Sequence, residues 1–314
     1  TPAPAPKQIV LKASLYYQAN DERTKPLNHY AQLINERTEG RVNIKVYPGQ
    51  QLMKVREEFA ALMGRTIDIN QTTASYYVSQ IPLAEFEVYP MFGIPSDKLK
   101  AALDAVAPIL EEEWNAKGVK SLYAAPGIIF YVYAVDDYID SIKDYEGRLF
   151  RGPTGIYEKT VGVWGAKLVP TSSPEQYVAL QRGVMDSGQT SSGSILAYRL
   201  YEVAPYMTNS GWQAASNRAF MNLRVFNELP EDIQKIFVDT AKDTSNWAFE
   251  TWFPAWVSKE AEDLEAASGK PVRYFPAEEM VKMRDVLPPI WEEYVAKYGD
   301  RSQRIEELWS AATK

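Results

Sequence analysis

The first fifty residues alternate apolar and polar positions, repeat apolar residues at helical spacing, and then alternate again. Residues 9–13 and 42–47 have the period of two that predicts β-strands. Between them, residues 27–34 carry apolar side chains every three or four positions, after an Asn-Asp pair at 20–21 that is suited to capping a helix. A strand, a helix and a strand in this order predict a parallel sheet, so the loop 14–20 should lie where ligands bind, at the carboxyl ends of the strands.

The rest of the chain repeats this alternation of strands and helices. Residues 96–118 predict a helix, and residues 119–124 and 128–135 are rich in the β-branched and aromatic residues that favour strands. A longer helical stripe runs through residues 230–252, and Pro254 is expected to kink or interrupt it. These elements predict an α/β fold.

The length of the chain is enough for two domains. It has 314 residues, of which 46% are hydrophobic, and can therefore bury two cores. We expect the chain to enter the second domain near 125–127 and to return near 208–212. The predicted division is residues 1–124 with 213–253 for domain I, and residues 125–212 with 254–314 for domain II.

Composition narrows the choice of function. The net charge of −7 argues against nucleic acids and anionic membrane surfaces as partners, although a single arginine can still hold one anionic ligand. The absence of cysteine excludes disulfides, thiolate zinc sites and thiol nucleophiles. No apolar run approaches the length of a membrane span, and the proline-rich start, TPAPAPKQ, resembles a mature terminus left after signal-peptide removal.

Catalytic and metal-binding motifs are missing from the sequence. His29 is the only histidine and falls within a predicted helix, where a surface or capping role is the usual one. Asp136, Asp137 and the run 111–113 could mimic acid/base pairs or a metal site, but such runs are usually solvated. We therefore predict no catalytic residue, no metal and no cofactor.

A short run near the middle of the chain carries two arginines. Residues 148–151, RLFR, predict a strand that ends at Gly152-Pro153, where a ligand could approach bare backbone. Side chains alternate faces along a strand, so Arg148 and Arg151 should point in opposite directions. Arg151 lies next to the strand end, and its guanidinium matches a carboxylate with two parallel hydrogen bonds. A solvated surface arginine is the ordinary alternative.

Five separated motifs in this order resemble the solute-binding proteins of TRAP (tripartite ATP-independent periplasmic) transporters. They are YPGQQL, GRTIDI, GRLFRGP, GAKLVP and EQYVALQRGVMDSG. The resemblance covers nearly the whole chain. It implies a two-domain periplasmic-binding-protein fold, with a long helix that spans both domains and a ligand cleft between them.

The resemblance also implies roles for individual residues. The arginine that clamps the substrate carboxylate in this family corresponds to Arg151. A second substrate arginine, often found twenty residues earlier, is replaced by Tyr131, and the family asparagine that bonds the carboxylate corresponds to Thr190. Ser173 matches a position that is often aromatic, although it also has the sequence of a helix cap.

Further candidates are aromatic or hydroxyl residues at expected cleft positions. Thr73 and Tyr76 occupy positions that contact substrate in several family members, and Tyr16 and Tyr17 lie in the first ligand-side loop. Trp212 stands where the family frequently has a polar residue. It is read either as a stacking partner of the ligand or as a core residue.

The loss of the second arginine affects the expected ligand. A pocket with one cation disfavours dicarboxylates and polyanions, so our first choice is an aromatic or hydrophobic monocarboxylate, with a benzoylformate-like or cinnamate-like body. A short 2-oxo or 2-hydroxy acid is the competitor, and a sulfonate or ectoine-like zwitterion comes third. The resemblance implies a periplasmic location and a TRAP membrane permease as partner.

Two other classes of function stay open at this point. One is an α/β enzyme that acts on a small acidic molecule, for example a hydrolase using Asp136 or Asp137. The other is a binding protein that serves as a sensor subunit, because transport and sensing both need only a recognised closed state. We expect a monomer, and the C-terminal helices leave dimerisation open.

Overall fold

The structure is a computed structural model and describes residues 8–89, 91–92, 94–152, 156–171 and 175–313. The chain forms two compact units, each assembled from three segments. Unit one contains Thr1–Glu85, Lys100–Pro126 and Ser216–Phe253. Unit two contains Phe86–Leu99, Gly127–Ala215 and Pro254–Lys314.

Unit one is built on a five-stranded sheet with the order β2-β1-β3-β11-β5. β1 is parallel to both β2 and β3, as the strand-helix-strand pattern predicted, whereas β11 is antiparallel to β3 and to β5. The sheet is therefore mixed, and β5 forms one of its edges. The strands are β1 (Ile9–Leu15), β2 (Val42–Tyr47), β3 (Ile69–Thr72), β5 (Val119–Pro126) and β11 (Ser216–Asn222).

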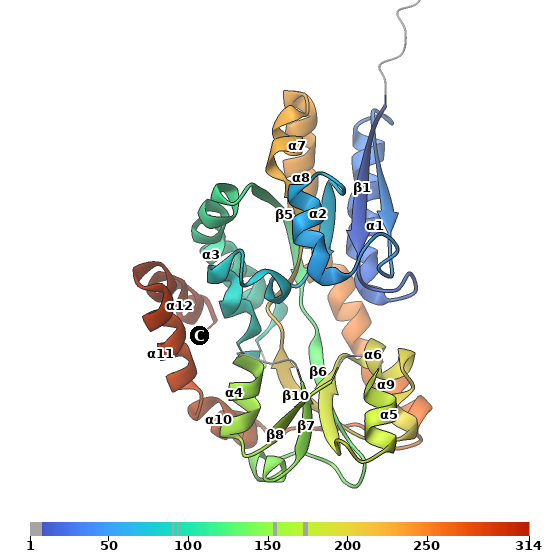
Figure 1. The fold of residues 1–314 in the computed structure, drawn as a ribbon, viewed down its shortest axis with the longest axis vertical. Helices are drawn as coiled ribbons and strands as arrows, with labels where there is room; N and C mark the ends of the chain where they lie inside the picture. Colours follow the sequence, from blue (N-terminus) through green and yellow to red (C-terminus); the bar gives the residue numbers. More distant parts are fainter. Residues whose placement is uncertain (1–7, 90, 93, 153–155, 172–174, 314) are drawn as a thin grey trace, which may run out of the picture. The chain divides into compact units, whose positions relative to one another are not determined.

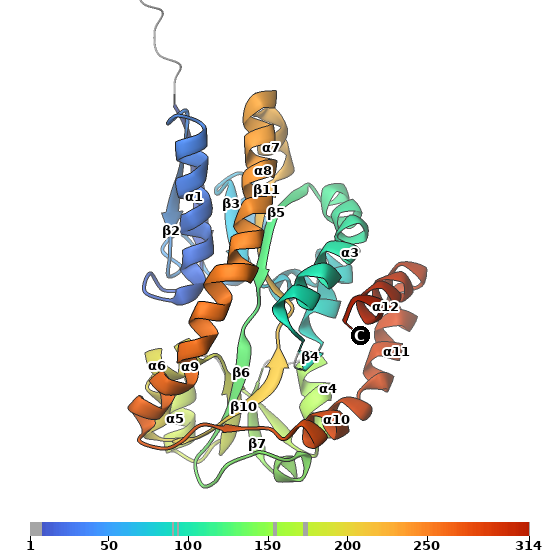
Figure 2. The ribbon, with the colours of Figure 1, turned by 180° about the vertical axis from the view of Figure 1, so that it is seen from behind.

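Helices cover both faces of this sheet. On one face α1 and α8 lie side by side (Figure 2), where Tyr30 packs against Tyr123 and its hydroxyl donates to the carbonyl of Phe237 at 3.2 Å. On the other face, the ring of Trp114 in α3 packs edge-on against Phe220 of β11. The helices of this unit are α1 (Lys25–Arg37), α2 (Glu58–Met63), α7 (Leu223–Glu228), α8 (Glu231–Trp247) and, from Lys100 onward, α3 (Ser96–Ala116).

Unit two has a seven-stranded sheet in which six strands follow the order β12-β10-β6-β9-β7-β8 and β4 pairs with β10. β7 is parallel to β8 and to β9, so the carboxyl ends of these three strands lie at one edge of the sheet. The strands are β4 (Met91–Phe92), β6 (Ile129–Ala134), β7 (Leu149–Gly152), β8 (Lys167–Pro170), β9 (Ser187–Thr190), β10 (Tyr206–Gln213) and β12 (Arg273–Tyr274).

The two faces of the second sheet have separate cores. Tyr131 and Tyr133, two positions apart on β6, pack into a cluster with side chains of α5, α6 and α9, including Leu180, Ile195 and Leu264. Phe130 points to the opposite face, toward α4. Figure 1 shows α4 on one side of these strands and α5 and α6 on the other. The helices are α4 (Ile156–Val163), α5 (Gln176–Gln181), α6 (Ser192–Ala197) and α9 (Phe253–Ser268), followed by α10 (Ala277–Asp285), α11 (Pro288–Tyr298) and α12 (Asp300–Thr313).

The long helix predicted near the C-terminal third is present and passes from unit one into unit two. α8 is followed by one π-helical turn, Ala248–Trp252, and then by α9. Pro254 has no N–H to bond the carbonyl four residues earlier, and the π turn immediately before it is one of the recognised ways of accommodating such a gap. The expected interruption therefore takes the form of a widened turn in a helical run that continues to Ser268.

Residues 86–99 group with unit two, whereas the division drawn from the sequence placed them in domain I. The reason is aromatic packing against the C-terminal helices. The ring of Tyr89 stacks on Trp291 with ring centroids 4.3 Å apart, and its hydroxyl donates to the carbonyl of Ile290 at 3.0 Å. Phe86 packs edge-on against Trp309. These contacts join residues that are far apart in the sequence, so no local sequence pattern predicts them.

Helices long and apolar enough to cross a lipid bilayer are absent from the part of the chain that the structure describes.

Candidate functional site

Arg151 lies at the carboxyl edge of the second sheet, as the next-to-last residue of β7. Its side chain is half-buried, and its Nε–H donates to the carbonyl of Thr171 at 3.0 Å. This bond comes from the loop after the neighbouring parallel strand β8 and fixes the plane of the guanidinium. In open α/β sheets, ligands bind at this edge.

A buried hydrogen bond between Tyr133 and Gln176 lies beside Arg151 on the same face of the sheet. The strand register places Arg151 level with Gly188 of β9, and Gly188 level with Tyr133 of β6. The hydroxyl of Tyr133 donates to Oε1 of Gln176 at 2.5 Å. Burial raises the pKa of Tyr133, and the positive charge of Arg151 opposes that rise. The phenol stays protonated and keeps its hydrogen bond.

Gly188 is required for this arrangement because a Cβ at this position would lie 2.5 Å from the Tyr133 hydroxyl oxygen and 2.7 Å from the Cβ of Arg151. We expect Gly188→Ala to lower the free energy of unfolding by about 1–3 kcal/mol, as overpacking does, and to displace Arg151. Gly193→Ala is the control, because a Cβ there meets no atom within 4 Å. Chemical denaturation of both variants measures the difference, and equal stability would contradict the close packing.

The second arginine of the motif, Arg148, is engaged elsewhere. It precedes β7, forms an ion pair with Asp136 and donates from Nε to the carbonyl of Asp144 at 3.3 Å. Burial of Asp136 would by itself raise the pKa of its carboxyl. The hydrogen bond and positive charge of Arg148 nevertheless hold this pKa below its usual value. A carboxylate of lowered pKa is a poor general acid or base at neutral pH, which argues against the hydrolase alternative at this residue.

The bare backbone of Gly152 does not open toward a ligand. A Cβ built on it would lie 1.9 Å from the ring of Tyr157, so this aromatic side chain fills the space that the sequence suggested for a ligand. The following residue, Pro153, falls outside the described residues. The glycine serves close packing of α4 on β7.

Two more candidates share the face of Arg151. Tyr131 and Thr190 are opposite one another in the antiparallel pairing of β6 with β9. Thr190 ends β9 at the carboxyl edge and is 7% exposed, whereas the ring of Tyr131 is 1% exposed and belongs to the core cluster of unit two. Tyr131, at the position where the resemblance implied a second arginine, carries no charge and exposes no ring face for stacking in this structure.

Trp212 lies on the other face of the same sheet. Its ring stacks on Tyr157 with centroids 5.1 Å apart and an interplanar angle of 24°, and it also contacts Phe130 and Trp164. The side chain is 1% exposed. Of the two readings offered by the sequence, the structure places Trp212 in an aromatic core, on the face opposite Arg151.

Unit one collects its candidates at the carboxyl edge of its own parallel strands. Tyr16 and Tyr17 follow β1, and Thr73 and Tyr76 follow β3. The rings of Tyr16 and Tyr17 are 3.9 Å apart, and Tyr76 meets Tyr16 edge-on at 5.3 Å. Burial raises the pKa of Tyr16 well above its ordinary value, so its phenol is a neutral hydrogen-bonding group.

Arg23 belongs to this cluster and escaped the sequence analysis. Its guanidinium carbon lies 4.0 Å from the centroid of the Tyr17 ring, and it forms an ion pair with Asp21. The Tyr17 hydroxyl donates to Oδ1 of Asn217 at the start of β11. Asp21 also accepts from the backbone N–H of Arg23, which places this short turn at the end of the ligand-side loop. Proximity in sequence to Tyr16 and Tyr17 was the available signal.

The remaining predictions concern Ser173, His29 and metals. Ser173 lies outside the described residues. His29 stacks on Trp247 with ring centroids 4.1 Å apart, and burial together with Arg37 lowers its pKa. Within the described part of the chain, no group of three or more His, Cys, Asp or Glu side chains is arranged to hold a metal ion.

Similarity to known proteins extends over nearly the whole chain. "C4-dicarboxylate-binding periplasmic protein DctP" of Rhodobacter capsulatus is 22% identical over 93% of this chain and 88% of its own length. "Monocarboxylate 2-oxoacid-binding periplasmic protein all3028" of a Nostoc strain is 24% identical over 90% of this chain and 78% of its own. A TRAP periplasmic solute-binding protein of Desulfovibrio salexigens, solved with bound orotic acid, superposes with a TM-score of 0.85 at 24% identity, covering 98% and 99% of the two chains.

The structural likeness confirms the predicted α/β binding-protein fold with its long helix. The family model "Bacterial extracellular solute-binding protein, family 7" (DctP) matches residues 14–298. Members of this family are extracytoplasmic solute receptors rather than enzymes. The chain therefore belongs to this family, that of the TRAP transporter solute-binding proteins, as its five motifs predicted.

Proposed function

We propose that this protein is a periplasmic receptor that binds a small organic acid through Arg151 and delivers it unchanged to a TRAP membrane permease. The observation that carries the proposal is the position of Arg151 in a chain of this family. A permanently charged guanidinium is half-buried at the carboxyl edge of three parallel strands, and Thr171 fixes its plane. Thr190, which ends the neighbouring strand, would supply a hydroxyl to the same carboxylate.

The charged residues near the candidate site favour a ligand with a single carboxylate. Arg148 is paired with Asp136, and Arg23 is paired with Asp21, so neither adds net charge to its unit's edge. Tyr131 brings no cation where other family members often have one. We therefore infer a monocarboxylate. At the carboxyl edge of unit one, the rings of Tyr16 and Tyr76, with Thr73 beside them, favour an aromatic or hydrophobic ligand body.

The relatives bind acids of different shape, which keeps a short 2-oxo acid as the alternative body. Their names include a C4-dicarboxylate, a monocarboxylate 2-oxo acid and orotic acid. A carboxylate is the common feature of these ligands. The body of the ligand is thus a separate question from the clamp, and the two need separate experiments.

Isothermal titration calorimetry with matched ligands tests the proposal. Benzoylformate, pyruvate and malonate would be compared with the methyl ester of benzoylformate, which keeps the ring and the ketone but has no charge. We expect one carboxylate to bind at a one-to-one ratio, the ester to bind far more weakly, and malonate to be disfavoured. Binding of the ester as tightly as the acid would contradict a carboxylate clamp.

Recovery of the ligand distinguishes a receptor from an enzyme. After incubation with the protein, chromatography should return the bound acid unchanged and in stoichiometric amount. Conversion of the acid to a product would instead favour the enzyme alternative. Recovery and conversion are measured on the same incubated sample, so the calorimetric evidence that the acid binds is unaffected by which of the two is found.

A further inference from the structure

Arg23 is fixed by hydrogen bonds to both its side chain and its backbone. Its Nε donates to Oδ1 of Asp21 at 2.8 Å and its Nη2 donates to Oδ2, so the two side chains, only 11% and 14% exposed, form a bidentate pair. The carbonyl of Arg23 accepts from Nε2 of Gln71 in β3 at 2.7 Å. The guanidinium is therefore held in one orientation within unit one.

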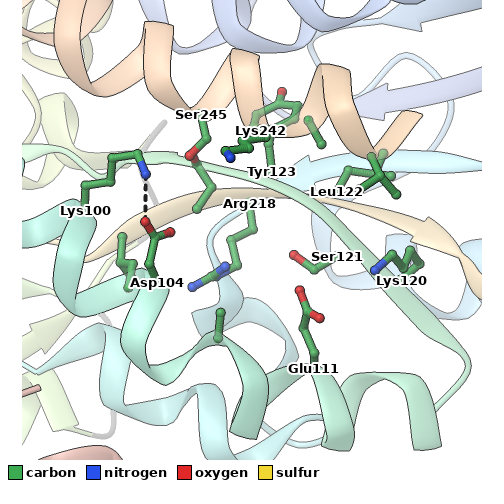
Figure 3. A pocket seen from close by; sticks show the side chains of 15 residues that line it. Lys100, Asp104, Glu111, Lys120, Ser121, Leu122, Tyr123, Arg218, Lys242 and Ser245 are labelled. Atoms are coloured by element: carbon green, nitrogen blue, oxygen red, sulfur yellow. Dashed lines mark hydrogen bonds and ion pairs between the residues drawn. The ribbon is translucent and has the colours of Figure 1, made fainter. Parts of the chain in front are cut away.

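The hydrogen bonds of Arg23 continue into the core of unit one. Oε1 of Gln71 accepts from the hydroxyl of Tyr123 in β5 at 2.5 Å. Tyr123 also lines a hollow of about 320 Å³ between α3 and α8 (Figure 3), and neither Arg23 nor Tyr17 lines that hollow. Arg23 is thus tied to β3 and β5, and the hollow is separate from the cluster to which Arg23 belongs.

Tyr17 is the ring that Arg23 holds. The guanidinium carbon lies 4.0 Å from the centroid of this ring. The Tyr17 hydroxyl donates to Oδ1 of Asn217, and Nδ2 of Asn217 donates to the carbonyl of Pro126 at 3.3 Å. Tyr17 is 3% exposed. Its ring is therefore a packed group rather than a surface on which a ligand could lie.

Tyr16 lies next to this ring and is half-buried. Its ring centroid is 3.9 Å from that of Tyr17, and Tyr76 meets it edge-on. The order from the interior outward is therefore Arg23, Tyr17 and Tyr16. A shift of the guanidinium would displace the Tyr17 ring and, through it, the Tyr16 ring at the carboxyl edge of unit one.

We propose that Arg23 is a positioning residue that selects for acids with an aromatic body. Through Tyr17 it holds the Tyr16 ring in one position, so this ring loses little freedom when a ligand packs on it. A buried ion pair adds little net stability, because desolvation offsets its Coulomb attraction, whereas it fixes the geometry of the groups around it. The inference rests on the proposed function, in which Arg151 binds the carboxylate.

Calorimetry with benzoylformate and pyruvate tests this role in a double variant, Asp21→Asn with Arg23→Gln. Both charges are removed together, so no unpaired charge stays buried, and asparagine caps the turn as aspartate does. We expect the affinity for benzoylformate to fall roughly three- to tenfold, the effect of one aromatic contact. The affinity for pyruvate, which has no ring, should change less than about twofold.

Two single variants make the result specific. Arg23→Lys keeps a cation beside Tyr17 and should retain most of the wild-type affinity for benzoylformate. Arg41→Gln removes an arginine of the same unit that pairs with Asp232 in a more exposed setting, and it should leave both affinities unchanged. Thermal unfolding confirms that each variant is folded.

Two calorimetric results would overturn the inference, namely an equal loss of affinity for both acids in the double variant and no loss for either. Crystal structures of the ligand-free wild type and double variant decide the same question without a ligand. We expect the Tyr17 and Tyr16 rings to be displaced in the variant, and unmoved rings would overturn the role of Arg23. These structures decide the inference even where the wild type binds neither acid, a result that would contradict the proposed function alone.

Discussion

Arg151→Ala should abolish measurable binding of the carboxylate ligand while the protein still folds. The guanidinium is half-buried and held by Thr171, so a bound carboxylate would form a charge-assisted pair shielded from water. Truncating one partner of such a pair costs about 2–5 kcal/mol, which is a loss of affinity of roughly 30-fold to several thousand-fold. Calorimetry with the best ligand of the wild type measures the effect.

Two variants make this result specific. Arg151→Lys keeps the charge but loses the planar fork, and we expect its affinity to lie between those of the wild type and the alanine variant. Arg148→Ala removes the neighbouring arginine, which pairs with Asp136, and should bind nearly as the wild type does. Thermal unfolding of each variant confirms that it is folded. An Arg151→Ala protein with wild-type affinity would remove the clamp from this position.

The fold could be predicted from sequence because its elements rest on local patterns. Alternation at residues 9–13 and 42–47, on either side of a helix, specified the parallel pair β1 and β2. The same reasoning could not foresee that β11 enters the first sheet antiparallel, since the chain returns from the other unit to form this strand only at Ser216, long after β5 ends at Pro126. Pairing between distant segments depends on tertiary contacts that no local period records.

Side-chain burial explains why the site was harder to predict than the fold. A motif can assign Tyr131 and Trp212 to ligand-side strands, but strand alternation and a bulge between Asn209 and Gln213 decide which face each ring occupies. Both rings fall in packed cores, on opposite faces. Arg23 was missed for the converse reason: its contact with Tyr17 depends on a turn capped by Asp21, and a charged residue in a loop is ordinarily solvated.

Glu58→Gln should stabilise the protein at pH 8 and have little effect at pH 4. Glu58 begins α2 and is fully buried in unit one. Its Oε1 accepts from Ser14 of β1 at 2.7 Å, and its Oε2 accepts from Asn70 of β3 at 3.3 Å. Burial nevertheless raises the pKa of this carboxyl from 4.5 to about 7, because these bonds and that of Tyr77 only partly offset the loss of hydration.

The native protein therefore keeps a proton on Glu58 over a range where the unfolded chain has lost it. Below pH 4.5 both states are protonated, and the residue adds no pH dependence. Between pH 4.5 and about 7 the native state binds more protons, so the free energy of unfolding falls as pH rises. Above that range the cost levels off at roughly 3 kcal/mol, from a pKa difference of about 2.5.

Glutamine removes this cost because it is neutral at every pH and fits the same space. The Oδ1 of Asn70 is buried without a hydrogen-bond partner among the described residues, so rotation of the Asn70 amide lets it accept from the new Nε2. Chemical denaturation at pH 4, 6 and 8 measures the stability gained relative to the wild type. Glu36→Gln, the same change at an exposed position of α1, is the control. A gain for Glu58→Gln that does not grow between pH 4 and pH 8 would mean that the buried carboxyl is ionised at no cost, and that its three polar neighbours fully replace water.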